Sequence, residues 1–353
     1  MWPSAETYHA LIRGDRRGPI AALTRAGLRA ASWPYGFGVW WRNRLYDRGW
    51  KTIHQAAVPV VSVGNLTLGG TGKTPCVEYV AGFYRDLGLP VAILSRGYGA
   101  DQGRNDEAMV LEENLPDVPH LQGPDRVALA TTAVEELEVE LLVLDDGFQH
   151  RRLGRELDIV LIDATAPPSR DYLFPRGTLR EQVRGLGRAG VFLLTRCDQV
   201  DPAAIEEARA WLTTRFPGCP VATSEHRPTE LIGVDRIGAV DDLRGRVVGA
   251  FSGIGNPAAF RRTLEDLGAR VAAFRAFPDH HPYARADIDD LNDWASGLPP
   301  GAMIATTQKD WVKLRVPDLG GRSLWAVRIG LAIRDGREAF NDALRRVVHD
   351  NWT

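Results

Sequence analysis

The sequence predicts an α/β protein in which a parallel sheet carries helices on both faces, together with a second, smaller α/β domain and an N-terminal amphipathic helix. Three observations lead to this fold class. An apolar, β-branched run over 58–63 leads into a glycine-rich turn and a helix. Another apolar run, over 140–146, ends in two aspartates. Between 58 and 216, strands alternate with helical segments, which is the order of a doubly wound sheet.

The stretch VPVVSVGNLTLGGTGKT, residues 58–74, is typical of a phosphate-binding loop and makes the predicted sheet P-loop NTPase-like. Glycines let backbone N–H groups converge on an anion, and the helix N-terminus adds a favourable dipole. Lys73 is expected to reach the β- and γ-phosphates of ATP, and the Thr74 hydroxyl to bind Mg²⁺. The residues expected to bind the nucleotide are Thr67, Gly69, Gly70, Thr71, Gly72, Lys73 and Thr74.

Two details of this loop bear on that interpretation. The chain has only four lysines, so a lysine inside the glycine turn favours phosphate binding, which suits a compact charge. Thr67 stands where the general pattern has its first glycine. An ordinary strand-to-helix turn is the alternative.

The second apolar run, ELLVLDD, predicts a buried strand that ends in Asp145 and Asp146. Carboxylates at the carboxyl ends of parallel strands lie where α/β sheets bind ligands. We expect Asp145 to hold Mg²⁺ and Asp146 to take part in catalysis. A strand capped by two turn-forming aspartates is the alternative, but the phosphate loop upstream favours the metal.

The remaining pattern defines the other elements and the domain boundaries. Helices are predicted over 75–87, 124–136, 202–215, 258–267 and 285–297, and strands over 89–94, 158–164, 190–198, 271–274 and 303–306. The predicted segments are an interfacial helical segment 1–54, a phosphate-loop core domain 55–220, a linker 221–240, a second α/β domain 241–335 and a C-terminal helix 336–353.

Residues 1–54 are basic and aromatic. The segment contains eight arginines and Lys51 but only three acidic residues, so its net charge is +6. Because the whole chain has a net charge of −2, the remaining residues carry −8. The segment also holds five tryptophans. Arginines on one side of a helix and aromatic residues on the other are typical of a helix that lies in a membrane interface. A helix packed on the body, with its arginines solvated, is the alternative.

Composition excludes several classes of protein. With 353 residues, 44% hydrophobic and 25% charged, the chain has enough apolar residues for about two globular domains. Its three cysteines show no metal or redox spacing, which fits a reducing compartment. No apolar run approaches the length of a transmembrane helix, and arginines interrupt the N-terminus where a signal peptide would need an apolar stretch.

Seven motifs occur in a fixed order: VGNLTLGGTGKTP, SRGYG, DDGFQH, GTLRE, FSGIGNP, FPDHH and TQKD. In this order the chain resembles the tetraacyldisaccharide 4′-kinase family of lipid A biosynthesis, from about Leu45 to Leu314. The resemblance implies ATP- and Mg²⁺-dependent phosphorylation of the 4′-hydroxyl of a tetraacyl glucosamine disaccharide 1-phosphate, which gives a lipid IVA-type product. It also implies an enzyme held peripherally on the cytoplasmic face of the inner membrane.

The same resemblance implies roles for further residues. Asp106 matches the family's catalytic acidic residue, whose carboxylate would accept the proton of the sugar 4′-hydroxyl. His280 matches its partner, and it is favoured over His281 because it directly follows Asp279. Glu181 matches a glutamate on the metal side of the site.

Other functions remain as alternatives at this stage. One is another P-loop ATPase of cofactor synthesis, and a second is a membrane-associated, ATP-switched scaffold. Scaffold proteins of that class carry a signature lysine where this chain has Leu68, which argues against them. A nucleic-acid-binding ATPase would use the basic segment on phosphates. We expect no nucleic-acid partner and no protein partner.

Overall fold

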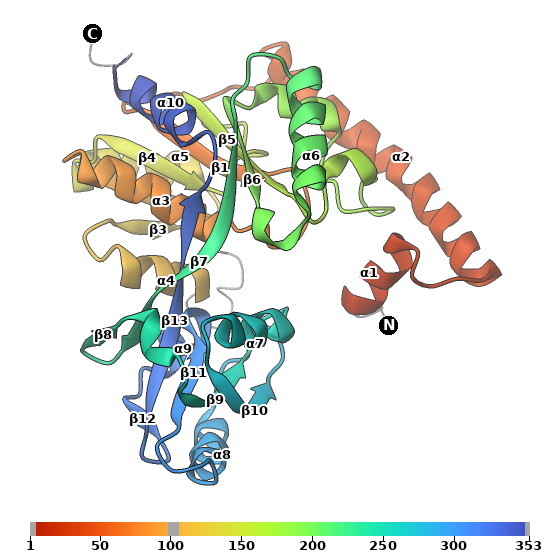
Figure 1. Ribbon diagram of the computed structural model, residues 1–353. Coiled ribbons are helices and arrows are strands. Elements are labelled where there is room, and N and C mark those ends of the chain that lie inside the picture. The colour runs from red at the N-terminus through yellow and green to blue at the C-terminus, as the bar shows by residue number, and fades with distance from the viewer. Residues whose placement is uncertain (1–4, 98–105, 350–353) are drawn as a thin grey trace. The chain divides into compact units, whose positions relative to one another are not determined.

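The computed structural model describes residues 5–97 and 106–349 (Figure 1). The chain divides into two compact units, which are described separately. Unit 1 comprises the described parts of 1–96, 121–225 and 333–353, and unit 2 those of 97–120 and 226–332.

Unit 1 contains the phosphate loop. Its helices are α1 (Ala5–Arg13), α2 (Pro19–Asp47), α3 (Lys73–Asp86), α5 (Arg126–Leu137), α6 (Pro202–Arg215) and α10 (Arg337–His349). Its strands are β1 (Val60–Asn65), β2 (Val91–Ser95), β4 (Leu141–Asp145), β5 (Leu157–Asp163) and β6 (Val191–Thr195), with β3 (His120–Gln122) and β7 (Val221–Gly233) partly in unit 2. Short 3₁₀ helices cover Pro168–Arg170, Val183–Arg188 and Cys197–Gln199.

The sheet of unit 1 has the strand order β7-β6-β5-β1-β4-β2-β3, and its strands run parallel from β7 to β2. In the central strand β1, Val61 pairs with Val143 of β4, and Val63 pairs with Ile159 of β5. All six residues of β1 are buried, because strands flank it and helices cover both faces. This burial on both faces explains why the valines of β1 do not alternate with exposed polar residues, and its polar residues Ser62 and Asn65 are buried as well.

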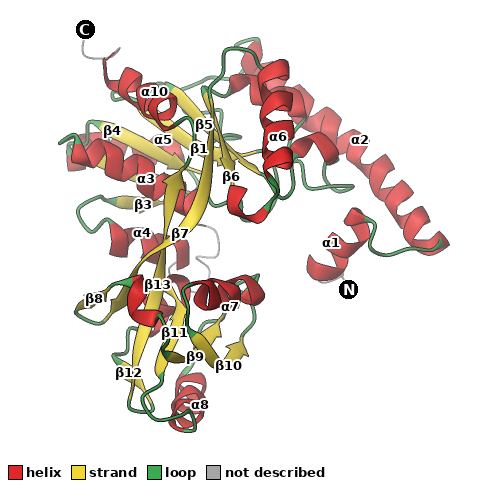
Figure 2. Ribbon diagram, in the orientation of Figure 1, coloured by secondary structure: helices red, strands yellow, loops and turns green. Residues whose placement is uncertain are grey.

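Helices cover both faces of this sheet (Figure 2), as is usual where helices connect parallel strands. One face packs against α5 and α6, through clusters that include Leu142 and Val160. On the other, α3 lies against β1, β2 and β4. The last helix, α10, packs on α3, where the Tyr84 hydroxyl donates to the carbonyl of Leu344 at 2.9 Å.

Unit 2 is a smaller α/β unit. Its helices are α4 (Asp106–Asn114), α7 (Pro257–Asp266), α8 (Arg285–Ser296) and α9 (Gln308–Leu314). Its strands are β8 (Arg236–Gly238), β9 (Val247–Ser252), β10 (Arg270–Ala276), β11 (Met303–Thr307), β12 (Asp318–Leu319) and β13 (Arg322–Ile333), with a short 3₁₀ helix at Val240–Leu243. The strand order is β10-β9-β11-β13-β7, while β8 pairs with β7 and β12 with β13. Phe251, Ile304 and Trp311 lie in its core.

The predicted fold class is confirmed, but the structure divides the chain differently from the predicted boundaries. The segment 97–120, expected within the core domain, belongs to unit 2, where α4 packs on α9. The C-terminal helix, predicted as a separate segment, belongs to unit 1 because it packs on α3. The predicted linker 221–240 contains β7 and β8. Both ends of β7 are buried and only its middle alternates, so its sequence lacked a strand signal. Asn105 and the end of the SRGYG motif lie outside the described residues.

The N-terminal helix α2 is 29 residues long and begins with Pro19, a residue suited to the first helical position. Its buried residues, Ser32 and Gly36, face Leu173. A Cβ at Gly36 would stand 2.9 Å from the Leu173 side chain, so glycine permits this close approach. Figure 1 shows α2 extending past the edge of the unit 1 sheet.

Candidate active site

The phosphate loop links β1 to α3 as the glycine pattern predicts. Gly69 and Gly72 have φ values of +110° and +83°, in the region that favours glycine. Gly72 is the N-cap of α3, so Lys73 and Thr74 begin the helix. Thr71 and Thr74 are buried. Backbone N–H groups at this helix N-terminus are therefore available to an anion.

Residues at the end of β6 donate hydrogen bonds to this loop, a feature that the sequence did not predict. The Thr195 hydroxyl donates to the carbonyl of Thr71 at 2.9 Å. Arg196, with φ +57°, donates to the carbonyl of Gly70 and forms an ion pair with Asp163. These contacts occupy carbonyl groups of the loop and leave its N–H groups for a ligand.

Lys73 lies close to Asp146 without a short contact to it. The Lys73 ammonium stands 3.7 Å from Asp146 Oδ1 and 3.5 Å from Asn65 Oδ1. Asp146 receives both of its close contacts from Arg180, whose Nη1 lies 2.8 Å from each carboxylate oxygen. Burial alone would raise the pKa of Asp146, but the charges of Lys73 and Arg180 outweigh it and hold the pKa below its ordinary value. Asp146 is therefore ionised at neutral pH.

Asp145 ends β4 beside the first turn of α3. Burial and the nearby Asp145 charge together raise the pKa of the Cys76 thiol, which places this carboxylate close to the helix. Thr74 and Asp145 thus supply two hard oxygen donors at the same edge of the sheet. Mg²⁺ keeps several waters and binds substrate phosphates, so two protein ligands fit its requirements. The described residues contain no group of three or more His, Cys, Asp or Glu arranged to hold a metal.

Glu181 is fully buried, and protein donors occupy its carboxylate. Arg188 and Asn43 each donate at 2.8 Å, and Gln149 donates at 3.2 Å. This arrangement ties α2 to the GTLRE segment through Asn43. The assignment of Glu181 as a metal ligand stays a prediction.

Unit 2 brings together residues that lie far apart in the sequence. Asp106, at the start of α4, has its Oδ2 3.1 Å from His280 Nδ1 and 3.0 Å from the Lys313 ammonium. Burial would raise the pKa of Asp106, but hydrogen bonds from both cations and the Lys313 charge lower it overall. The hydrogen bond to Asp106 raises the pKa of His280 in turn. The pair therefore consists of an ionised carboxylate and a readily protonated imidazole.

The two adjacent histidines have different surroundings. His280 reaches Asp106, and its φ of +59° belongs to a strained turn. His281 instead lies 3.1 Å from Asp287 and packs its ring on Phe277 and Tyr283. The geometry favours His280 as the residue that acts with Asp106.

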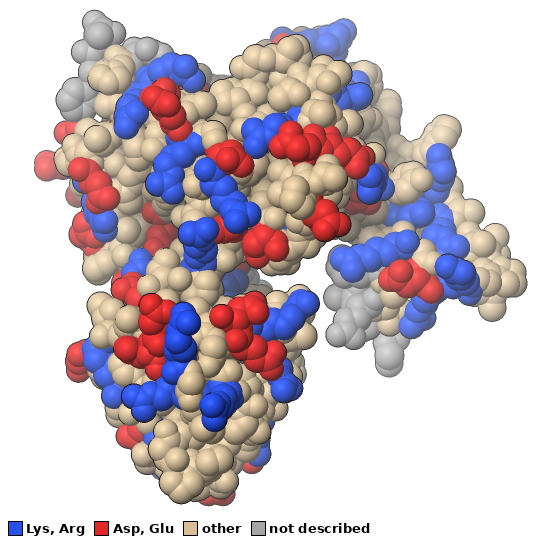
Figure 3. Space-filling view, in the orientation of Figure 1, with Lys and Arg blue, Asp and Glu red and all other residues tan. Residues whose placement is uncertain are grey.

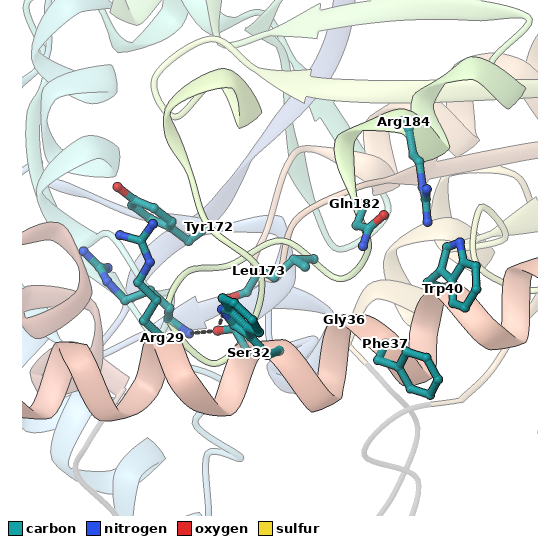
Figure 4. A pocket seen from close by; sticks show the side chains of 11 residues that line it. Arg29, Ser32, Gly36, Phe37, Trp40, Tyr172, Leu173, Gln182 and Arg184 are labelled. Carbon is teal, nitrogen blue, oxygen red and sulfur yellow. Dashed lines mark hydrogen bonds between the residues drawn. The ribbon is translucent and has the colours of Figure 1, made fainter.

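A pocket of about 530 Å³ lies in unit 1 between α2 and the segment 172–184 (Figure 4). Aromatic and basic side chains dominate its lining, which comprises Arg29, Ser32, Trp33, Gly36, Phe37, Trp40, Tyr172, Leu173, Arg176, Gln182 and Arg184. The guanidinium groups of Arg29 and Arg176 lie 5.5 and 4.5 Å from the centre of the Tyr172 ring. The pocket therefore combines apolar surface with positive charge.

The same helix exposes large apolar side chains, both at the pocket and beyond it. Exposed fractions reach 82% for Ile20, 78% for Trp33 and 63% for Phe37. Figure 3 shows Lys and Arg side chains gathered over α1 and the adjoining end of α2. Among the described residues, no helix is long and apolar enough to cross a membrane.

Comparison with known proteins gives consistent matches. The family model described as Tetraacyldisaccharide-1-P 4′-kinase matches residues 24–349. The Tetraacyldisaccharide 4′-kinase of Anaeromyxobacter dehalogenans (strain 2CP-C) is 42% identical over 353 residues, covering 94% of this chain and 92% of the relative. The protein of that name from Syntrophus aciditrophicus is 38% identical, covering 84% and 85%. The crystal structure of "apo" form LpxK from Aquifex aeolicus in complex with ATP matches with a TM-score of 0.76 and 32% identity, covering 92% of this chain and 99% of that one.

Proposed function

The chain belongs to the tetraacyldisaccharide-1-P 4′-kinase family, and on this basis we propose that it transfers the γ-phosphoryl group of ATP to the 4′-hydroxyl of a tetraacyl glucosamine disaccharide 1-phosphate. The product is of the lipid IVA type, an intermediate of lipid A and hence of lipopolysaccharide. The other P-loop ATPases and the ATP-switched scaffold are not favoured, because the family match extends over residues 24–349.

In this proposal the phosphate loop of unit 1 binds ATP. Its backbone N–H groups and Lys73 neutralise the phosphate oxygens, on which charge changes during transfer. Bound Mg²⁺ supplies further neutralisation of the β- and γ-phosphates. Thr74 and Asp145 are the residues that would hold it. Asp146 keeps Lys73 oriented by its charge while Arg180 occupies both of its oxygens.

The single observation that carries the acceptor side is the Asp106–His280 contact. A sugar hydroxyl must lose its proton as it attacks, and a nearby carboxylate that is ionised at neutral pH can accept that proton. The lowered pKa of Asp106 ensures ionisation, and His280 orients the carboxylate. The proton goes from the 4′-hydroxyl to an Asp106 oxygen as the new bond between the 4′-oxygen and the γ-phosphorus forms. The bond from the γ-phosphorus to the bridging oxygen breaks, and ADP is the leaving group.

We also propose that α1 and α2 hold the enzyme peripherally on the cytoplasmic face of the inner membrane. Exposed aromatic and aliphatic side chains supply apolar area, and the arginines are attracted to anionic headgroups. A substrate with four acyl chains has little free concentration in water, so an enzyme at the membrane surface meets it directly. No nucleic acid and no protein partner forms part of the proposal.

Incubation of the purified chain with γ-labelled ATP, Mg²⁺ and the disaccharide 1-phosphate lipid tests the function. The expected result is label in a bisphosphorylated lipid, with the new phosphate on the 4′ position by mass and NMR analysis. A matched lipid without a free 4′-hydroxyl should take up no label. ATP hydrolysis without a phosphorylated lipid would refute the proposal.

A further inference from the structure

Lys313, in α9, is more enclosed than Asp106 and His280. Its side chain is only 7% exposed, whereas that of His280 is 59% exposed. The ammonium donates to Asp106 Oδ2 at 3.0 Å and to the carbonyl of His281 at 2.9 Å. It also lies 5.3 Å from the centre of the Tyr283 ring. A buried lysine remains charged only where such partners replace water.

A second carboxylate, Asp310, stands on the other side of Lys313. Asp310 Oδ1 lies 3.6 Å from the Lys313 ammonium, one helical turn away in α9. Asp106 and Asp310 thus share one lysine. Two carboxylates around one buried cation leave the group with a net negative charge, which His280 offsets when it is protonated.

Asp310 is fully buried and held in place by other protein groups. Its Oδ2 accepts from the Gly253 N–H at 3.0 Å and from the Thr307 hydroxyl at 2.6 Å. Its Oδ1 accepts from the Tyr283 hydroxyl at 3.0 Å. With these bonds made, Asp310 is anchored to the residue that follows β9, to the N-terminus of α9 and to the loop before α8. It is a structural carboxylate with no free oxygen for a ligand.

These contacts form a continuous series from the backbone to the proposed proton acceptor. Gly253 fixes Asp310, Asp310 faces Lys313, and Lys313 bonds Asp106. Position 253 has no space for a side chain, because a Cβ would stand 2.9 Å from Asp310 Oδ1 and 3.2 Å from the Cβ of His281. The FSGIGNP, FPDHH and TQKD motifs therefore meet at one point of unit 2.

We propose that Lys313, anchored by Asp310, is a positioning residue that fixes the Asp106 carboxylate and places a positive charge beside it. The inference rests on the proposed role of Asp106 as proton acceptor. His280 is exposed and can lose its proton, whereas Lys313 is enclosed and makes two short hydrogen bonds to protein groups. The charge of His280 can then change with pH, whereas the Lys313 ammonium is held in place beside Asp106.

The charges around Asp106 determine what removal of Lys313 should do. Lys313 and His280 touch Asp106, Asp310 lies behind Lys313, and Asp279 stands 3.9 Å from His280. Lys309, on the same helix, bonds Glu107 at 2.8 Å. Burial raises the pKa of Asp106, and Lys313 is one of the two groups that lower it. Without Lys313 that pKa rises, so the base becomes protonated at a higher pH.

The test compares Lys313→Met, Lys313→Arg and the matched control Lys309→Met in the full chain. The first variant removes the charge and keeps the length, and the second keeps the charge. We expect Lys313→Met to lower kcat on the order of 10- to 100-fold, because misplacement of a reacting group has effects of this size. The KM for ATP should stay within about twofold of wild type. Lys313→Arg should recover most of the activity, and Lys309→Met should stay within about threefold, since it breaks a partly exposed pair and leaves both contacts to Asp106 in place.

The pH profile separates a positioning role from a merely structural one. The ratio of Lys313→Met to wild-type kcat should fall as the pH is lowered from 7 to 5, because the base is lost earlier in the variant. Thermal unfolding followed by circular dichroism checks that each variant is folded. Asp310→Asn should resemble Lys313→Met if it folds, but Lys313→Met alone decides the question. A folded Lys313→Met variant with a pH profile parallel to wild type would overturn the inference, whatever its kcat.

An Asp106→Asn variant distinguishes this failure from failure of the proposed function. If Asp106→Asn loses turnover while Lys313→Met keeps the wild-type profile, Asp106 is the base and only the positioning inference fails. If Asp106→Asn keeps turnover, the assignment of the base itself is wrong and the inference falls with it.

Discussion

The phosphate loop of unit 1 and the Asp106 cluster of unit 2 each place a lysine beside a carboxylate, but the two lysines are bonded differently. Lys73 stands 3.7 Å from Asp146, and its other neighbour, Asn65, is at 3.5 Å. Lys313 stands 3.0 Å from Asp106 and also donates to a backbone carbonyl at 2.9 Å. An ammonium group has three donors. Those of Lys73 are only weakly used, whereas Lys313 uses two in short hydrogen bonds to protein groups.

This difference separates a lysine that binds a ligand from one that supports the protein. Arg180 satisfies Asp146 by a two-oxygen contact, so Lys73 is free to turn toward an incoming phosphate. In unit 2, the cationic side chains that contact Asp106 among the described residues are Lys313 and His280. Of these, Lys313 is enclosed, whereas His280 is exposed. Loss of Lys73 should therefore affect nucleotide binding and turnover together, whereas changes in unit 2 should affect turnover alone.

The largest expected effect is at Lys73. Lys73→Met removes the charge that meets the β- and γ-phosphates, so kcat/KM for ATP should fall by about a thousandfold, as for other losses of transition-state electrostatics. Steady-state kinetics with varied ATP measure kcat/KM, and calorimetric titration with ATP measures the binding affinity. Unchanged ATP affinity in this variant would break the comparison, because Lys73 would then not be a ligand-binding lysine.

A smaller effect is expected at His280. His280→Gln should lower kcat on the order of tenfold to thirtyfold with an unchanged KM for ATP, because the residue orients the base. The raised pKa of His280 means that wild type loses the imidazolium proton only as the pH rises above the ordinary histidine range. Wild-type kcat should therefore fall on the alkaline side, and the variant should lack that fall. An alkaline fall of the same size in both enzymes would show that His280 does not act on Asp106.

Membrane contact should depend on unit 1 and not on unit 2. Trp33→Ser combined with Phe37→Ser removes two exposed aromatic side chains from α2, and binding to anionic vesicles should weaken by at least about tenfold. The matched control is Ile237→Ser, which removes a side chain that is 73% exposed in unit 2. A vesicle sedimentation assay compares them. Equal binding of the double variant and the control would contradict the interfacial role of α2.

The smallest effects concern stability, where two histidines should respond to pH in opposite directions. In unit 1, burial lowers the pKa of His150 to about 4, aided by nearby arginines. The unfolded chain then binds more protons than the folded one below the ordinary histidine pKa, so the contribution of His150 is lost as the pH falls from about 6.5 toward 4. The raised pKa of His280 works the other way, and its contribution is lost as the pH rises through the folded-state pKa.

Thermal unfolding from pH 5 to pH 8 checks this contrast. His150→Gln should gain stability relative to wild type as the pH is lowered, and His280→Gln should lose stability relative to wild type over the same change. Parallel curves for both variants would mean that neither shift is present in the folded chain.

The two regions also differ in how far the sequence predicted them. The phosphate loop and the Asp145–Asp146 pair follow from local patterns. A β-branched run, a glycine turn and an apolar strand can each be recognised from a few consecutive residues. The residues that donate hydrogen bonds to that loop, Thr195 and Arg196, have no local signature because their partners lie more than 120 residues away. Composition alone could not identify them.

In unit 2 the pairing of Asp106 with His280 was predicted only through the resemblance to a family. These residues are separated by 174 positions, and no periodicity connects them. The sequence assigned no role to Lys313 or to Asp310, the last residue of the TQKD motif. A lysine three residues after an aspartate in a short helix reads as an ordinary surface pair. The burial of Lys313 distinguishes this pair from a surface pair. That burial depends on the packing of α4 against α9, a tertiary contact that the local sequence does not encode.

The central claim is that unit 1 binds the nucleotide while Asp106 of unit 2 serves the chemistry, and Asp106→Asn tests it most directly. Single-turnover phosphoryl transfer and ATP affinity should be measured on the same preparation, with the exposed Asp318→Asn of unit 2 as control. The account predicts that transfer slows by about a thousandfold while the Kd for ATP stays within about threefold and the control behaves as wild type. Transfer close to the wild-type rate, or a loss of ATP affinity as large as the loss of rate, would contradict it.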